Sequence, residues 1–95
     1  MARAITRVVN DGSRLFAMGN DGTLWTCDCI LPLSWTQLPD IHVQTGQTAA
    51  DIAVANRIPP ESGLTRFVVC GNGTIYHLTW STTGVGTWVL DQGLP

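Results

Sequence analysis

Few residues in this chain could carry out metal or redox chemistry, and their spacing assembles no reactive group. The cysteines are Cys27, Cys29 and Cys70, an odd number that closes no disulfide framework within one chain. A zinc site would need further ligands at suitable spacing, and the histidines are His42 and His77. We therefore predict no metal and no other cofactor, and we interpret the cysteines as small apolar packing residues.

The chain also offers few residues in contexts that suit acid–base or nucleophilic catalysis. Asp28 and His77 stand in similar segments and could form an acid–base pair across a subunit seam, although solvent or a channel explains each equally well. No serine lies in a nucleophile-elbow context, and no basic residue follows the glycines at 71 and 73. Four other aspartates lie in turn-like contexts: Asp11, Asp21, Asp40 and Asp91. We predict that the protein is not an enzyme.

Ligand binding is better supported by the sequence, because the chain has 4 tryptophans and 1 tyrosine. Aromatic rings stack on the C–H faces of sugars, and planar polar side chains bond sugar hydroxyls. Trp80 is the best candidate because it lacks an aromatic counterpart in the other half of the chain, whereas Trp35 and Trp88 match as packing residues would. The full set of predicted ligand-binding residues is Trp80, Trp25, Tyr76, Arg14, Arg66, Asp21 and Asn72, with Asn20 as a further polar partner.

Charge and hydropathy exclude other classes of protein. Charged residues make up 13%, lysine is absent and the net charge is −2, which argues against nucleic-acid binding. No apolar run approaches the ~20 residues that span a bilayer, so we expect no membrane insertion. Met1 is followed by no signal-like apolar stretch, which favours a cytoplasmic protein or one released without a classical signal.

The chain repeats itself with a period of about 50 residues, which lies in the propeller-blade range. Residues 15–25 and 67–76 share an apolar run, Gly-Asn, and Gly-Thr-aliphatic-aromatic, when one gap is placed in the turn. Upstream, the segment that starts at Ile5 aligns with the one that starts at Ile52, and both copies end in Leu-Pro. We expect a single domain, 1–95, with two repeats at about 4–40 and 50–95.

Each copy is predicted to form four short strands joined by turns rich in Gly, Asn and Asp. The first copy has strands at 5–9, 15–18, 23–29 and 34–38, and the second at 51–55, 66–70, 74–80 and 87–90. No window shows helical periodicity, so the fold class is all-β. The second strand of each copy is apolar on both faces, which favours propeller blades over a sandwich with one wet face.

The run Phe16-Ala-Met-Gly-Asn-Asp-Gly-Thr-Leu-Trp25, followed by Trp35-Thr-Gln-Leu-Pro39, resembles the tectonin-type propeller repeat. Variants of that repeat occur in bacterial propeller lectins, so the resemblance implies four-stranded antiparallel blades and suggests glycan binding. The second copy departs from the pattern by a shorter turn at Asn72-Gly73 and by Tyr76 in place of Trp25.

Two blades cannot close a propeller, which needs about four to eight. We therefore expect homo-oligomerisation head to tail into a closed ring. A trimer with six blades is favoured, a dimer or tetramer is the alternative, and a fragment of a longer chain is a further one. The predicted function is a multivalent lectin with shallow aromatic-lined sites at blade or subunit seams. The alternative is a non-catalytic scaffold that binds a protein partner through loops 57–64 or 81–86.

Overall fold

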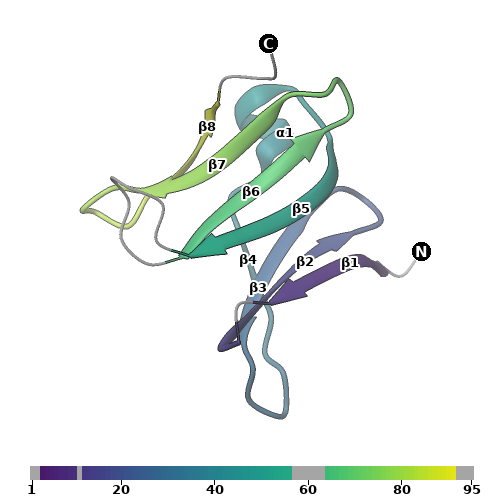
Figure 1. Cartoon of the computed structure of the whole chain (residues 1–95), viewed down its shortest axis with the longest axis vertical. Coiled ribbons are helices and arrows are strands. Elements are labelled where there is room, and N and C mark those ends of the chain that lie inside the picture. Colours follow the sequence, from purple (N-terminus) through teal and green to yellow (C-terminus); the bar gives the residue numbers. More distant parts are fainter. Residues whose placement is uncertain (1–2, 11, 57–63, 92–95) are drawn as a thin grey trace.

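Two antiparallel sheets of four strands make up most of the computed structural model, which describes residues 3–10, 12–56 and 64–91 (Figure 1). Sheet A has the order β1-β2-β3-β4 and sheet B the order β5-β6-β7-β8. The bounds are β1 Ile5–Asn10, β2 Arg14–Gly19, β3 Leu24–Asp28, β4 Thr36–Gln37, α1 Ile41–Thr45, β5 Ala49–Asn56, β6 Leu64–Cys70, β7 Ile75–Trp80 and β8 Gly86–Leu90. The prediction of two four-stranded antiparallel sheets is confirmed, and α1 is an addition to it.

The tight turns after β2 and β6 have the same length, so the gap placed between the two copies is wrong. Each turn is closed by the backbone N–H of its glycine, Gly22 or Gly73, which donates to the carbonyl three residues earlier at 3.0 and 2.9 Å. Both glycines have positive φ, 81° and 86°, a region that other residues adopt only with strain. Asn72 therefore takes the place of Asp21. The shared Gly-Asn dipeptide had drawn the sequence alignment out of register.

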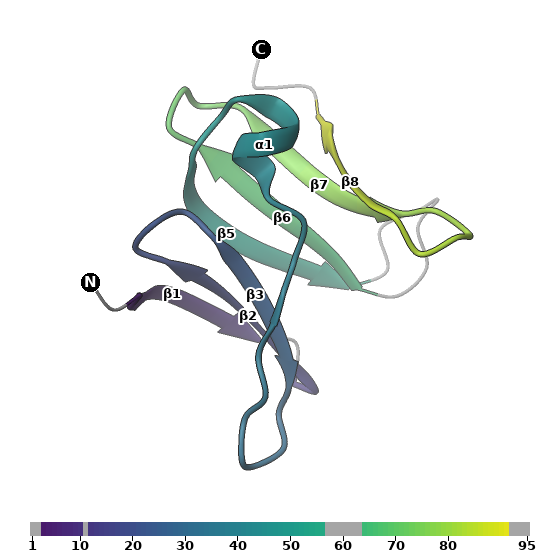
Figure 2. The same cartoon turned by 180° about the vertical axis from the view of Figure 1, so that it is seen from behind.

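The sheets pack on each other through one face each, which we call their inner faces (Figures 1 and 2). Successive side chains alternate between the faces of a strand, and residues paired in register share a face. β1 and β2 of sheet A contact β5 of sheet B. The buried cluster between them combines sheet A and sheet B side chains: Phe16, Met18, Leu24 and Leu38 from the first, and Ile52, Val68, Tyr76, Leu78 and Trp88 from the second.

The opposite faces, which we call the outer faces, carry apolar side chains that remain partly open to solvent. The outer face of sheet A includes Val8, Ala17, Trp25 and Trp35. The outer face of sheet B includes Phe67, Val69, Ile75, His77 and Asp91. Val8 is 51% exposed and Val69 is 38% exposed. Each of β2 and β6 is thus covered on its inner face by the other sheet, as their apolar sequence requires.

A short helix, α1, lies between β4 of sheet A and β5 of sheet B. The Asp40 carboxylate accepts hydrogen bonds from the backbone N–H groups of His42 and Val43, at 2.9 and 3.3 Å, and caps the N-terminus of α1. Gly46 ends the helix with a φ of 75°. A helix of five residues is too short to show a 3.6-residue period, which is why the sequence pattern missed it.

The helix fastens the end of sheet A to the last strand of sheet B. Ile41 is 1% exposed and joins the buried cluster. The Gln44 side chain donates to the Gly86 carbonyl at 3.0 Å and accepts from the Trp88 backbone N–H at 2.8 Å. The Trp88 indole N–H donates to the Pro39 carbonyl at 2.8 Å. Across the described residues, no helix is long and apolar enough to cross a membrane.

Candidate functional site

A depression of about 280 Å³ lies on the outer face of sheet A. Two tryptophans line it: Trp25 from β3, and Trp35 from the segment just before β4. Small residues leave the space open, because Ala17 and Gly19 on β2 carry little or no side chain there. The remaining lining residues are Arg3, Ala4 and Ile5. A concave, mostly apolar surface with a few polar groups at its edge is the usual form of a small-molecule site.

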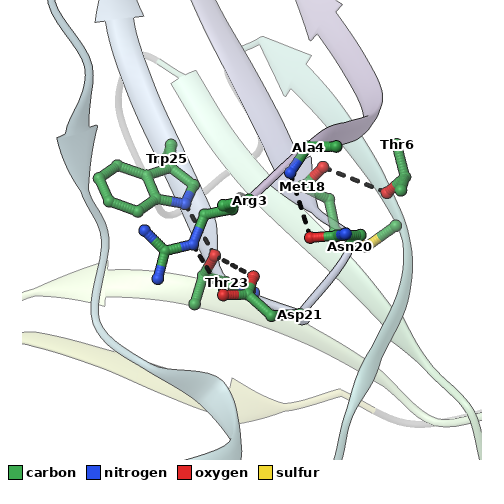
Figure 3. A network of polar contacts seen from close by, with 8 residues as sticks. All are labelled: Arg3, Ala4, Thr6, Met18, Asn20, Asp21, Thr23 and Trp25. Carbon is green, nitrogen blue, oxygen red and sulfur yellow. Dashed lines mark hydrogen bonds and ion pairs between the residues drawn. The ribbon is translucent and has the colours of Figure 1, made fainter. Parts of the chain in front are cut away.

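Two of the lining residues, Arg3 and Trp25, belong to a chain of four side chains that Thr23 and Asp21 complete, as Figure 3 shows. The Trp25 indole N–H donates to the Thr23 hydroxyl at 2.8 Å, and that hydroxyl donates to Asp21 Oδ1 at 2.6 Å. The other carboxylate oxygen of Asp21 accepts from Arg3 Nε at 2.7 Å. The Arg3 guanidinium carbon lies 4.9 Å from the centroid of the Trp25 ring, within cation–π distance. The network therefore fixes both the tryptophan and the arginine.

Asp21 is held in its charged form by this network. Hydrogen bonding from the Thr23 side chain, followed by that from Arg3, lowers the pKa of the Asp21 carboxyl well below its usual range. Its Oδ1 also accepts from the Thr23 backbone N–H at 3.2 Å. Asn72 makes the same contacts with Thr74 in sheet B, at 3.2 Å to the backbone N–H and 2.6 Å to the hydroxyl. The aspartate at position 21 thus adds a charge to a turn that an asparagine closes equally well.

The two leading aromatic candidates lie in different environments. Trp80 is 51% exposed, as its lack of a counterpart suggested. Its ring rests on Gly86, where a Cβ atom would come within 2.8 Å of Trp80 Cζ3, so one side of the indole is supported by backbone. Tyr76 is 9% exposed and packs in the cluster between the sheets. Neither residue lines the depression at Trp25.

The polar candidates are dispersed over the molecule. Arg14 lies 3.6 Å from Asp28 at the end of β2, and Arg66 Nη2 donates to the Thr26 hydroxyl at 3.4 Å in the seam between the sheets. Asn20 Oδ1 accepts from the Ala4 backbone N–H at 3.2 Å and anchors the start of β1. Asn72 closes the other turn, in sheet B. Of the predicted residues, the structure brings together Trp25, Asp21 and Asn20.

The depression also contains residues that sequence reasoning missed. Arg3 and Trp35 line it together with Ile5, although Trp35 had been interpreted as a packing residue. Trp88 does have that packing role, with 4% exposure. A match in sequence position could not separate the two tryptophans, because the difference arises from which face the other sheet covers.

A second pair of titratable groups lies on the outer face of sheet B. His77 Nδ1 lies 2.7 and 2.8 Å from the two carboxylate oxygens of Asp91. An ionised carboxylate only accepts hydrogen bonds, so Nδ1 carries the proton. The pairing of His77 with Asp28 across a subunit seam stays a prediction; within one chain, Asp28 lies in sheet A beside Arg14.

The cysteines divide into two kinds. Cys27 and Cys70 are buried, and burial raises the pKa of each thiol, which keeps both protonated. Cys29 is exposed, beyond the end of β3, so it is not a buried packing residue like the other two. Within the described ranges, no cluster of three or more His, Cys, Asp or Glu side chains is placed to hold a metal ion.

No family model, curated protein or solved structure matches the chain.

Proposed function

We propose that this protein binds carbohydrate, without catalysis, in the depression at Trp25 and Trp35. The observation that carries the proposal is the combination of two indole rings and Arg3 in the lining of one concave surface, with that arginine held by the Asp21 carboxylate. Sugars present C–H faces that stack on indoles and hydroxyls that need planar polar partners. The sequence contains such residue types in several places, but here they converge.

The hydrogen-bonding capacity of the edge suits a polyhydroxylated ligand. A guanidinium has five N–H donors, and the bond to Asp21 uses the one on Nε. Hydrogen bonds that involve a charged partner are about twice as strong as neutral ones. Because the Asp21 carboxyl stays ionised, the arginine is held in one orientation over Trp25. A preorganised edge lowers the entropy cost of binding.

The tectonin-type resemblance supports the same function. Each sheet then corresponds to one propeller blade, and a closed ring requires several copies of the chain, with a six-bladed trimer favoured over a dimer or tetramer. Such a ring would repeat the depression once per chain. Sites with micromolar-to-millimolar affinity would then act together by multivalency on a glycan-bearing surface.

A protein-binding scaffold is the second candidate, and one observation favours it. The segment between β3 and β4 projects from sheet A (Figure 1) and exposes three large apolar side chains: Ile30 at 70%, Leu31 at 85% and Leu33 at 41%. Apolar groups that cluster on a projecting loop are typical of interaction sites. Of the loops named from sequence, 57–63 lie outside the described residues, and 81–86 exposes a single large apolar side chain, Val85 at 60%.

Glycan-array screening followed by calorimetry tests the carbohydrate proposal. The probes are free hexoses, deoxyhexoses and N-acetylhexosamines, titrated to high concentration. We expect Trp25→Ala to abolish binding and Trp80→Ala, which removes an exposed tryptophan outside the depression, to retain it. Loss of binding in Trp80→Ala alone would move the site to Trp80. If the wild-type chain binds none of the sugars, the proposal is overturned. If sugar binding is retained after replacement of Leu31, the projecting loop takes no part in it.

A further inference from the structure

The register of the two sheets defines which residues are equivalent. Val8 pairs with Ala17 in sheet A as Ile52 pairs with Val68 in sheet B, so the sequence match of Ile5 with Ile52 is wrong. By the same register, Trp25 corresponds to Tyr76 and Trp35 to Trp88. The outer face of sheet A is therefore equivalent to the inner face of sheet B.

The remaining two faces are equivalent as well. Phe67, Val69 and Ile75 on the outer face of sheet B hold the positions of three residues buried between the sheets: Phe16, Met18 and Leu24. Within the chain, the inner face of sheet B already packs on the inner face of sheet A. The outer face of sheet A should accordingly fit the outer face of sheet B in a second copy, by the same sheet-on-sheet contact.

We propose that a second copy of the chain covers the outer face of sheet A with its own outer face of sheet B, and that its His77–Asp91 pair then faces the Trp25–Trp35 depression. The carbohydrate site would thus combine aromatic rings from one copy with an imidazole and a carboxylate from the next. The inference deepens the proposed function and rests on it for the ligand. A contact between different faces is heterologous and leads to a ring where its rotation closes.

Differences between the equivalent positions explain why one seam is filled and the other holds a site. Val68 and Cys70 fill the seam inside the chain, and their counterparts Ala17 and Gly19 leave the depression. Leu38, 5% exposed in the buried cluster, follows Gln37 as Asp91 follows Leu90, and so corresponds to Asp91. At the outer seam, smaller side chains and polar groups therefore stand where apolar side chains fill the inner seam.

The polar pair would supply what the tryptophans lack. The Asp91 carboxylate accepts hydrogen bonds from sugar hydroxyls, and the Nδ1 bond to it fixes the ring of His77. Because Nδ1 is bonded to Asp91, Nε2 is the ring nitrogen of His77 that can bond a sugar hydroxyl, as acceptor in the neutral ring or as donor in the imidazolium. The ligand class is thus a neutral hydroxylated ring, stacked on indole and bonded at its edge by groups from two copies.

Assembly is tested first, and without any sugar. Val8→Asp alters the outer face of sheet A, Val69→Asp alters that of sheet B, and Val43→Asp, at an 80% exposed position on α1, is the matched control. In light scattering, we expect wild type and Val43→Asp to be multiples of 10.2 kDa and each face variant alone to be a single chain. Mixed together, the two face variants should form heterodimers, because the intact outer face of sheet A in one variant can contact the intact outer face of sheet B in the other.

Three results would overturn the docking: a wild type that is a single chain, face variants that assemble like the control, or a mixture that does not pair. A face variant that dimerises with itself would also overturn it, since that indicates contact between identical faces.

The composite site is tested by complementation. We expect Asp91→Asn rings to lose about 10- to 100-fold in affinity for the best-binding monosaccharide of the panel, as for loss of a charged hydrogen bond. Trp25→Ala and Asp91→Asn chains folded together in equal amounts should regain about a quarter of the wild-type sites, those at junctions with both intact faces. Undiminished binding by Asp91→Asn, or no recovery in the mixture, would overturn the composite site. If no sugar binds to the wild-type chain, the proposed function and the role of the His77–Asp91 pair are both wrong. The molar masses from light scattering still test the contact between copies.

Discussion

The seam between the two sheets inside the chain and the two outer faces are formed by equivalent positions of the repeat, but they differ in how they are packed. At the inner seam, Phe16 and Val68 are almost completely buried. At the outer faces, the corresponding positions hold Phe67, which is half-buried, and Ala17, a small residue that is 1% exposed and lines a depression. The comparison shows how a repeated unit can keep one contact as a hydrophobic core and leave the equivalent face as a depression with polar groups by a few changes in side-chain size and charge.

The largest expected effect comes from the phenylalanines of the two seams. Phe16→Ala should lower the free energy of unfolding by about 3–5 kcal/mol, because it leaves a cavity in the core. Phe67→Ala should cost much less at low protein concentration, and its cost should grow with concentration if copies assemble. Urea unfolding at two protein concentrations measures both. Equal losses at low concentration would contradict the distinction between the seams.

Exchange of side-chain volume between the seams sharpens the comparison. Val68→Ala should destabilise the chain by about 2 kcal/mol, through lost burial and a new cavity. Ala17→Val should abolish sugar binding, because its two added methyl groups would crowd the depression that Ala17 lines. Ala17 is itself 1% exposed, so the larger side chain should also cost about 1–3 kcal/mol of stability through overpacking. Thermal unfolding and calorimetry check the pair. Full sugar binding by Ala17→Val would show that the depression is not the site.

The helix that fastens the inner seam should contribute a smaller amount. Asp40→Ala removes the side chain that caps α1 and should cost about 1 kcal/mol. Asp40→Asn is the control, since asparagine caps equally well. The difference between the two variants in chemical unfolding gives the contribution of the cap. If both variants unfold alike, the hydrogen bonds to His42 and Val43 do not stabilise the seam.

The smallest expected effect is the pH dependence of the turn at Asp21. The pKa of this carboxyl is lower in the folded chain than its unfolded value of about 3.9. Its stabilising contribution is therefore present above pH ~4 and is lost as the pH falls below that value. Asp21→Asn keeps the turn, as Asn72 does, but does not titrate. The difference in Tm between wild type and this variant should shrink below pH ~4, and a difference that is constant from pH 7 to pH 2 would contradict the Arg3–Asp21 contribution.

The strands were predictable because their signals are local. Turn residues such as Gly22 and Gly73 have their positive φ set by the chain near them, and strands extend between such turns. The errors arose where local signals were absent or misleading. The Gly-Asn dipeptide misplaced Asn72, and α1 depends on Ile41 finding a place in the core between the sheets.

The candidate site was predictable in part. Trp25 and Asp21 were identified from residue type and repeat position, and they do lie together. Arg3 and Trp35 were missed as residues that line the depression, and nothing in their local sequence marks them. They come into place because β1 and β4 flank β2 and β3 in the same sheet.

The two-copy pattern, the strands and their antiparallel pairing follow from short segments of the chain, since strand length, turn chemistry and alternation are local properties. Which face of each sheet is covered depends instead on how the two sheets pack against each other. That choice separates Trp88 in the core from Trp35 in the depression, although the register gives them the same position. The physical reason is that burial depends on the neighbouring sheet, which approaches one face of each strand and leaves the other open.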